Sequence, residues 1–206
     1  MTTTTTIAAH SETPRRSAGD RLWPLFGTAS AIGYFVGIAT FSLDTPISDQ
    51  RAAMRVGASA ALLAAVLLPV YGIRLRRYLA DQLPARSIIP AMASAGTVAA
   101  SATIATVQLV RLALADSTIA VAHLGTAPNE LLDTLSVGAW MPFLLTLVAV
   151  AVAGLRFGAL PRWLSGVGVI AAIAGIVLIA AGGPPIFLPS AAWLTVSGLG
   201  LAIGRA

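Results

Sequence analysis

The feature that most limits the fold of this chain is a stretch of twenty-four consecutive residues without a charge, between Arg86 and Arg111. An α-helix needs roughly twenty predominantly apolar residues to cross the hydrocarbon core of a bilayer. In lipid, every backbone polar group needs an internal hydrogen-bond partner, which a helix provides. Further uncharged stretches cover residues 22–43, 56–73, 134–155 and 163–204. The sequence therefore predicts an integral membrane protein built of transmembrane helices.

The composition supports the same class. Of the 206 residues, 57% are hydrophobic and only 10% are charged, whereas about a quarter of the residues of a typical soluble domain are charged. No polar segment approaches the roughly forty residues below which a soluble domain rarely folds alone. We therefore expect one membrane domain and no separate soluble catalytic or binding domain.

The uncharged stretch at residues 163–204 is too long for one span and long enough for two. The Gly-Gly-Pro-Pro sequence at residues 182–185 marks the break, because paired glycine and proline interrupt helices. We therefore expect an all-α fold, a six-helix transmembrane bundle over residues 22–206, after a disordered cytoplasmic tail at residues 1–21. The expected spans are residues 22–43, 52–73, 88–111, 134–155, 163–181 and 185–204.

Arginine placement predicts the orientation. With the N-terminus in the cytoplasm and six spans, ten of the thirteen arginines lie on the inner side, as the positive-inside rule requires. Both termini are then cytoplasmic. Because the arginines are scattered at span ends, orientation explains them better than a nucleic-acid partner does. The absence of lysine beside abundant alanine and arginine is typical of a GC-rich bacterial genome and favours a bacterial cytoplasmic membrane.

Arg111 is the sharpest single candidate for a functional residue. An ionisable group within a span is by default a functional hypothesis, since its burial is costly. At about 1.5 Å per residue, Arg111 lies roughly 36 Å along a helix counted from Ser87, near the outer headgroups. Two interpretations remain open: a side chain that extends to the headgroups, and a ligand-binding charge that Arg55 could join.

A second group of candidates follows Arg111. His123, Glu130 and Asp133, with Asp116, carry side chains that suit zinc or iron, but their spacing matches no recognised metal motif. If Pro128 begins the next helix, Glu130 and Asp133 share a face of its first turn and complement the helix dipole. A solvated loop, a metal site and acid-base catalysis by His123 all remain open; we assign no metal and no cofactor.

Small residues predict close helix contacts. Gly33 and Gly37 lie four residues apart, as do Gly200 and Gly204, and such pairs let a second helix approach closely. We expect these faces to serve packing, self-association or a protein partner, with membrane lipids around the bundle. Cysteine is absent, which excludes disulfides and thiol chemistry.

One local motif resembles a known group. Residues 160–170, Leu-Pro-Arg-Trp-Leu-Ser-Gly-Val-Gly-Val-Ile, resemble the Leu-Pro-Arg-Trp-Leu-Gly hairpin of small, uncharacterised multi-pass bacterial membrane proteins that are grouped as domains of unknown function. Ser165 stands where glycine is usual. The resemblance covers about a tenth of the chain and implies a fold type, with no activity or site residues.

Three classes of function fit these observations. Short loops and spans without buried polar networks favour a non-catalytic accessory, assembly or regulatory component of a membrane complex. The alternative is a small transporter or binder of a lipidic or anionic small molecule, with Arg111 and Arg55 facing the ligand. An intramembrane enzyme using His123, Glu130 and Asp133 is the third class, and no catalytic residue is assigned.

Overall fold

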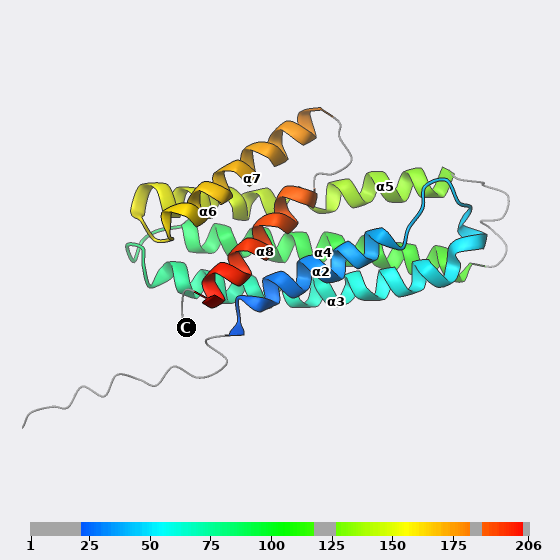
Figure 1. Cartoon of the computed structure of the whole chain (residues 1–206), viewed down its shortest axis with the longest axis horizontal. Coiled ribbons are helices and arrows are strands. Elements are labelled where there is room, and N and C mark those ends of the chain that lie inside the picture. The colour runs from blue at the N-terminus through cyan, green and yellow to red at the C-terminus, as the bar shows by residue number, and fades with distance from the viewer. Residues whose placement is uncertain (1–21, 118–126, 182–186, 204–206) are drawn as a thin grey trace, which may run out of the picture.

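The structure is a computed structural model that describes residues 22–117, 127–181 and 187–203. In these ranges all regular structure is helical and no strand occurs. The helices (Figure 1) are α2 (Leu25–Ala39), α3 (Ile47–Ala80), α4 (Ile89–Asp116), α5 (Ala127–Ala139), α6 (Phe143–Phe157), α7 (Arg162–Ala180) and α8 (Phe187–Ile203).

Neighbouring helices form a closed ring. Helix α3 packs between α2 and α4, α4 packs against α5 and α6, and α6 packs against α7. Helix α8 closes the ring because it contacts both α7 and α2. Helix α2 begins and α8 ends at the same end of the bundle (Figure 1), which we name the terminal end. The opposite end, where α2 connects to α3, is the far end.

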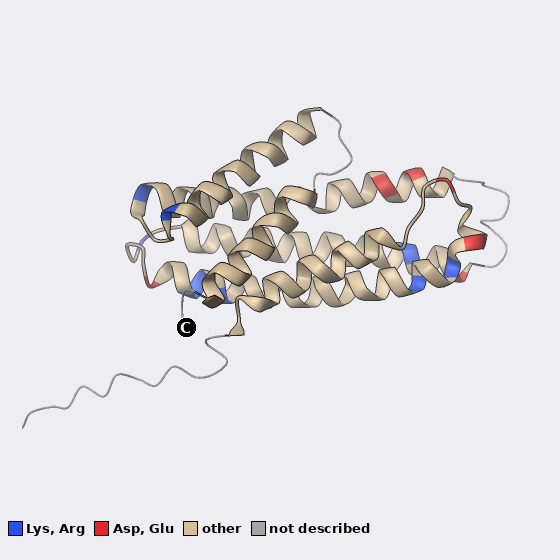
Figure 2. Ribbon diagram, in the orientation of Figure 1, with Lys and Arg blue, Asp and Glu red and all other residues tan. Residues whose placement is uncertain are grey.

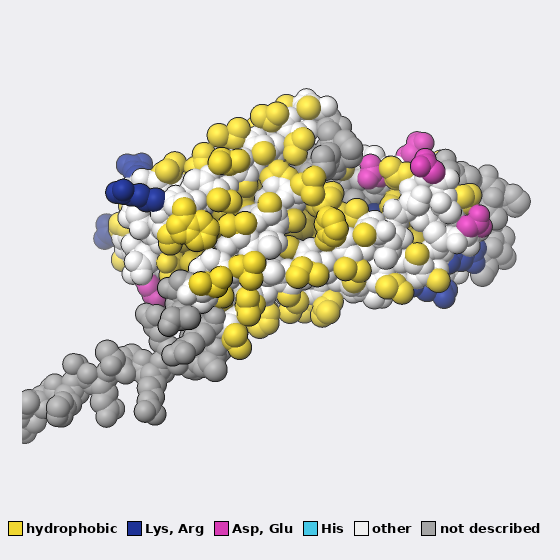
Figure 3. Space-filling view, in the orientation of Figure 1, with side chains coloured by type: hydrophobic (Ala, Val, Ile, Leu, Met, Phe, Trp, Pro, Cys, Tyr) yellow, Lys and Arg dark blue, Asp and Glu magenta, His cyan; other side chains and the backbone are white. Residues whose placement is uncertain are grey.

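Four helices are long and apolar enough to cross a membrane: α3, α4, the segment Ala127–Phe157 that contains α5 and α6, and α7. Helices α2 and α8 are apolar but shorter, with 15 and 17 residues. Charged residues lie mostly near the two ends of the bundle (Figure 2), and the flank between them is rich in hydrophobic side chains (Figure 3). The prediction of an all-helical fold is confirmed for the described residues, and four helices that could cross a membrane suggest a membrane protein. The count of six crossings stays a prediction.

Several helices differ in extent from the expected spans. Helix α3 continues to Ala80, so the arginines at residues 74–77 lie on a helix and not in a loop. The fourth expected span consists of two helices, α5 and α6, separated at residues 140–142. Pro142 has no backbone N–H to continue the helix. Tight turns bridge the break, with Phe143 N donating to Trp140 O at 3.0 Å.

Helix lengths make the two ends of the bundle unequal. At about 1.5 Å per residue, α3 and α4 extend roughly 51 Å and 42 Å, whereas α7 and α8 extend only about 28 Å and 26 Å. The α7–α8 pair begins near the terminal end and turns back before the far end (Figure 1). The far end is therefore built by α2, α3, α4 and α5 alone among the described helices.

Small residues and hydroxyls hold the helices together. A Cβ atom added to Gly37 would lie 2.9 Å from the carbonyl oxygen of Gly57, so α2 and α3 meet backbone to backbone. Ser30 donates to the carbonyl of Ala64 at 3.1 Å, and Ser101 donates to that of Ala65 at 2.6 Å. Interhelical contacts of this kind replace the hydrophobic drive that lipid cannot supply.

Gly33 also faces α3, where an added Cβ would lie 3.0 Å from the carbonyl oxygen of Ala60. Gly200 faces the ring of Trp163 on α7. Gly204 lies outside the described residues. The described members of the two glycine pairs thus serve packing within the chain, and their use in association with a partner remains a prediction.

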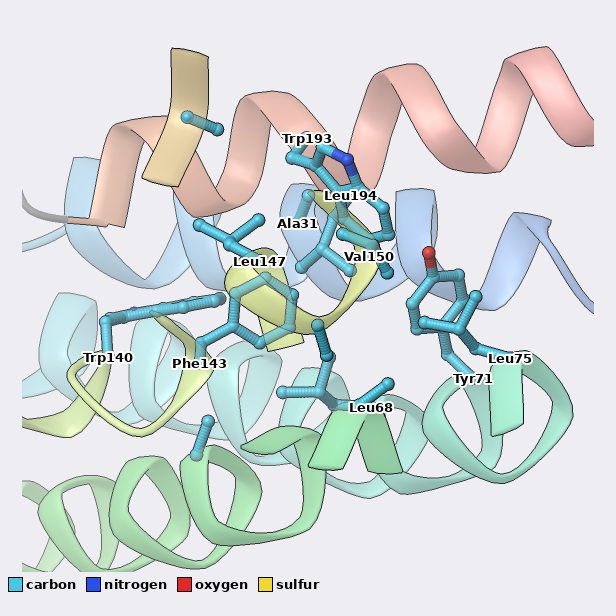
Figure 4. Close-up of a cluster of buried hydrophobic side chains, with 14 of the residues drawn as sticks. Ala31, Leu68, Tyr71, Leu75, Trp140, Phe143, Leu147, Val150, Trp193 and Leu194 are labelled. Atoms are coloured by element: carbon cyan, nitrogen blue, oxygen red, sulfur yellow. The ribbon is translucent and has the colours of Figure 1, made fainter. Parts of the chain in front are cut away.

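Aromatic side chains fill the middle of the ring (Figure 4). Tyr71 of α3 lies edge-on to Trp193 of α8, with ring centroids 6.2 Å apart, and its hydroxyl shares a hydrogen bond of 2.9 Å with Ser197. Phe143 contacts Trp193 from α6, at 6.4 Å between centroids. The interior is therefore a packed core.

We expect Gly37→Leu to separate α2 from α3, because the added side chain has no space against the backbone of α3. Overpacking of this kind costs about 1–3 kcal/mol. Thermal unfolding in a mild detergent should show a lower melting temperature. Gly166→Leu is the matched control, since an added Cβ on this glycine of α7 meets nothing within 4 Å; equal melting temperatures for both variants would contradict the prediction.

Candidate functional site

The guanidinium of Arg111 is buried at the far end of the bundle. The side chain is only 4% exposed, and its Nη2 donates to Ser136 Oγ of α5 at 3.1 Å. The ring of Phe41, from the connection between α2 and α3, lies 4.5 Å from the guanidinium carbon. The side chain thus turns into the protein, because α5 and the α2–α3 connection close over it. That Arg111 lies at the depth of the outer headgroups stays a prediction.

Aromatic rings border this charge. Tyr34 of α2 and Trp140, directly after α5, meet edge to face with centroids 4.8 Å apart. Both side chains are at most 2% exposed. Tyr34 and Asp133 are close enough to Arg111 to interact with its charge electrostatically. The guanidinium therefore lies in a low-dielectric surrounding, in which an unpaired charge is costly.

The hydrogen-bonding capacity of this region is incompletely used. A guanidinium carries five N–H donors, yet Arg111 Nε has no hydrogen-bond partner among the described residues. No carboxylate of the described residues lies within 4.0 Å of this guanidinium. The ion pair found between described residues is a different one, Arg55–Asp116. The Oε1 atom of Gln108, three residues earlier on α4 and 1% exposed, also lacks a partner there. We name Tyr34, Phe41, Gln108, Arg111, Ser136 and Trp140 the Arg111 cluster.

Two buried amides fix the connection that carries Phe41. Gln50 of α3 accepts a hydrogen bond from Ser42 N at 2.9 Å and donates to Ser42 O at 2.8 Å and to Thr45 O at 2.6 Å. Asn129 of α5, 0% exposed, donates to Leu43 O at 3.1 Å and to Thr45 O at 2.8 Å. The connection at residues 40–46 is thereby tied to both α3 and α5, which holds Phe41 over Arg111.

The other candidate residues are not brought to Arg111. Arg55 is exposed and pairs with Asp116, with Nη2 and Oδ1 2.7 Å apart. Glu130 lies in the first turn of α5, as expected for a helix that begins near Pro128, and it is exposed. Asp133 is half-buried and reaches the Arg111 cluster only electrostatically.

His123 lies outside the described residues, so the structure does not test its part in a metal or acid-base site. Within the described ranges, no three acidic or histidine side chains gather closely enough to hold a metal ion. The three acidic candidates lie in different places. Asp116 pairs with Arg55, Glu130 lies in the first turn of α5, and Asp133 lies near Arg111. These carboxylates therefore do not form one site among the described residues.

Most members of the Arg111 cluster were not predicted from the sequence. Gln108 carried a usable signal, because an amide three residues before an arginine shares its helix face. No sequence signal indicated Ser136, Tyr34 or Phe41, because serine and aromatic residues are common in transmembrane helices. Their roles depend on how α2, α4 and α5 meet.

Comparisons with known proteins found no match: no protein-family model, curated protein or solved structure is similar to this chain. The local motif at residues 160–170 therefore remains a resemblance, and the function has to be argued from the Arg111 cluster.

We expect Asn129→Leu to loosen the connection at residues 40–46, because the carbonyl of Leu43 loses its amide donor and the carbonyls of Ser42 and Thr45 keep only the amide of Gln50. Each buried group left without a partner costs about 1–3 kcal/mol. Hydrogen exchange measured by mass spectrometry should rise in this connection. Glu130→Gln is the control, since the neighbouring side chain is exposed; unchanged exchange in the leucine variant would show that Asn129 does not hold the connection.

Proposed function

We propose that this protein is a membrane-embedded binder, or a small transporter, of an anionic small molecule or lipid headgroup, and that Arg111 is the residue that meets the anion. The observation that carries the proposal is a guanidinium only 4% exposed, whose one side-chain hydrogen bond among the described residues is to Ser136 at 3.1 Å. Among the described residues, Arg111 is the one charged residue that is fully buried; Arg51 of α3 also has a buried Nε without a partner, but it is only half-buried.

The protein offsets only part of the free-energy cost of burying the Arg111 charge. Moving a charged group out of water costs several kcal/mol even after the surroundings relax, and a hydroxyl with one cation–π contact returns only part of this. A carboxylate or phosphate supplies two parallel charge-assisted hydrogen bonds to a guanidinium. An anionic ligand would therefore stabilise the Arg111 cluster more than any neutral one.

Two other classes remain as separate predictions. An accessory subunit should co-purify with a partner in fixed stoichiometry after mild detergent extraction. An enzyme would require His123 to approach Glu130 or Asp133. The structure favours neither over anion binding, because Arg111 is the buried charge that lacks a counter-ion within the described ranges.

We further propose a six-crossing topology in a bacterial cytoplasmic membrane, with both termini in the cytoplasm. The support is the arginine distribution, since six of the nine arginines among the described residues lie at the terminal end, on the first or last turns of helices or in the connection after α3. In this orientation the Arg111 cluster faces the outer side. A ligand would then reach it from outside the cell or from the outer leaflet.

The topology can be tested with single cysteines, because the natural chain has none. Ser48→Cys places a thiol at the start of α3 at the far end, and Gln82→Cys places one in the connection after α3 at the terminal end; both positions are exposed. A membrane-impermeant maleimide should label Ser48→Cys in intact cells and Gln82→Cys only after lysis. The reverse pattern would overturn the orientation.

Anion binding can be tested by thermal stabilisation, because a ligand that binds the folded state raises its melting temperature. The purified protein in neutral detergent is heated with phosphatidylglycerol, phosphatidylcholine or inorganic phosphate. We expect phosphatidylglycerol or phosphate to raise the melting temperature of the natural protein, and phosphatidylcholine to do so less. Arg111→Gln should lose the difference between anionic and zwitterionic additives.

Arg55→Gln is the matched control, because Arg55 lies at the same end of the bundle but is exposed and paired with Asp116. It should keep the anion-dependent stabilisation. Loss of this stabilisation in both variants would assign the effect to general surface charge, and its persistence in Arg111→Gln would refute the proposed function.

A further inference from the structure

The structure contains a groove along the seam between α4 and α5, one turn from Arg111. We propose that this groove holds an acyl chain of a membrane lipid in the leaflet nearer the far end, and that the anionic headgroup of the same lipid meets Arg111. This inference rests on the proposed function and names its ligand class, an anionic phospholipid.

The groove has a volume of about 390 Å³. It is lined mostly by apolar and small side chains, and Gly138 leaves it open because an added Cβ there would meet nothing within 4 Å. The lining residues are Ala102, Thr103, Thr106, Val107, Thr134, Leu135, Gly138 and Ala139. This volume lies within the roughly 300–1,000 Å³ typical of pockets for small ligands.

The hydroxyls in the lining are already used. Thr103 donates to backbone carbonyls, including that of Ala139 across the seam at 2.7 Å. Thr106 and Thr134 each donate to the carbonyl four residues earlier on their own helices, both at 2.9 Å. The groove therefore presents methyl groups and methylene surface, and a polar occupant would lose its hydration without gaining hydrogen bonds.

The depth of the groove matches the hydrocarbon of one leaflet. At about 1.5 Å per residue, its α4 residues lie roughly 20–27 Å from the start of that helix, and Arg111 lies about 33 Å from it. The hydrocarbon core is about 30 Å thick. If α4 enters this core at its first residues, the groove lies in the leaflet nearer the far end and Arg111 lies at its headgroups.

The two parts of the site share one seam. Antiparallel α4 and α5 are tied by the hydrogen bond from Thr103 to Ala139 and, farther toward the far end, by that from Arg111 to Ser136. The groove follows the same turns of both helices. A chain lying in it would direct its polar end toward Arg111, which places charge and apolar surface in the order that a phospholipid presents them.

An acyl chain suits this space better than a protein helix does. A helix with its side chains is about 10–12 Å across, so it would cover the groove without filling it. Exposed lining residues such as Leu135, at 39%, open the groove to the flank, where lipid surrounds a membrane protein. The proposed occupant is therefore a lipid chain, and the experiment below can also detect a partner helix.

The experiment uses the full chain in nanodiscs with two photoreactive lipids. One is a phosphatidylglycerol and the other a phosphatidylcholine, each with a diazirine in the middle of one acyl chain, and mass spectrometry locates the labelled residues. Ile173 on the outward face of α7, 57% exposed, reports contact with ordinary surrounding lipid. We expect phosphatidylglycerol to label residues 102–107 and 134–139 several-fold above Ile173.

Gly138→Leu should fill the groove and lower this labelling to the level of Ile173, whereas Gly166→Leu should leave it unchanged, because both glycines have open space but only Gly138 lines the groove. Arg111→Gln should abolish the preference for phosphatidylglycerol over phosphatidylcholine. Arg111→Lys, which keeps the charge, should retain part of that preference, and thermal unfolding confirms that each variant is folded.

Groove labelling no higher than that of Ile173, or equal labelling in Gly138→Leu and the natural protein, would overturn the acyl-chain site while leaving anion binding at Arg111 intact. A groove effect without any effect of Arg111→Gln would instead overturn the headgroup assignment and the proposed function with it. A groove that no lipid labels, in a protein that migrates as a dimer or complex, would show that protein covers this face.

Discussion

Close backbone contact between helices is the interaction on which this architecture depends. Lipid is as apolar as a leucine side chain, so helices in a membrane gain little by burying apolar surface against one another. The contact of Gly37 with Gly57 and the hydroxyl bonds from Ser30 and Ser101 to α3 carbonyls supply packing and hydrogen bonding in its place. These contacts join α2, α3 and α4 into the wall from which the rest of the ring continues.

The unequal helix lengths connect the fold to the candidate site. Because α7 and α8 are short, the far end is enclosed only by α2, α3, α4 and α5 among the described helices. There the bundle places a buried charge, Arg111, under a connection that Gln50 and Asn129 hold by their amide groups. A polar, hydrogen-bonded end thus adjoins a flank of apolar side chains, which is the arrangement that a binder of amphiphilic anions requires.

The sequence indicated the class of fold and the region of interest. Long uncharged stretches predicted the helices, and the rarity of charge within them identified Arg111, since an arginine in such a stretch needs a physical reason. Helix ends were less predictable. Helix α3 continues through Arg74 to Ala80 because arginine is a good helix former, and neighbouring helices stabilise an extension that apolar content alone does not indicate.

Composition and length alone predict apolar helices with charges at their ends, because a helix must be long and apolar enough for the hydrocarbon core and must satisfy its own backbone hydrogen bonds. The inward turn of Arg111 to Ser136 and Phe41, and the groove between α4 and α5, follow from how the helices pack. Those outcomes depend on the break after α5 and on side chains from four separate segments. These side chains come together through helix packing, which a local sequence pattern does not predict.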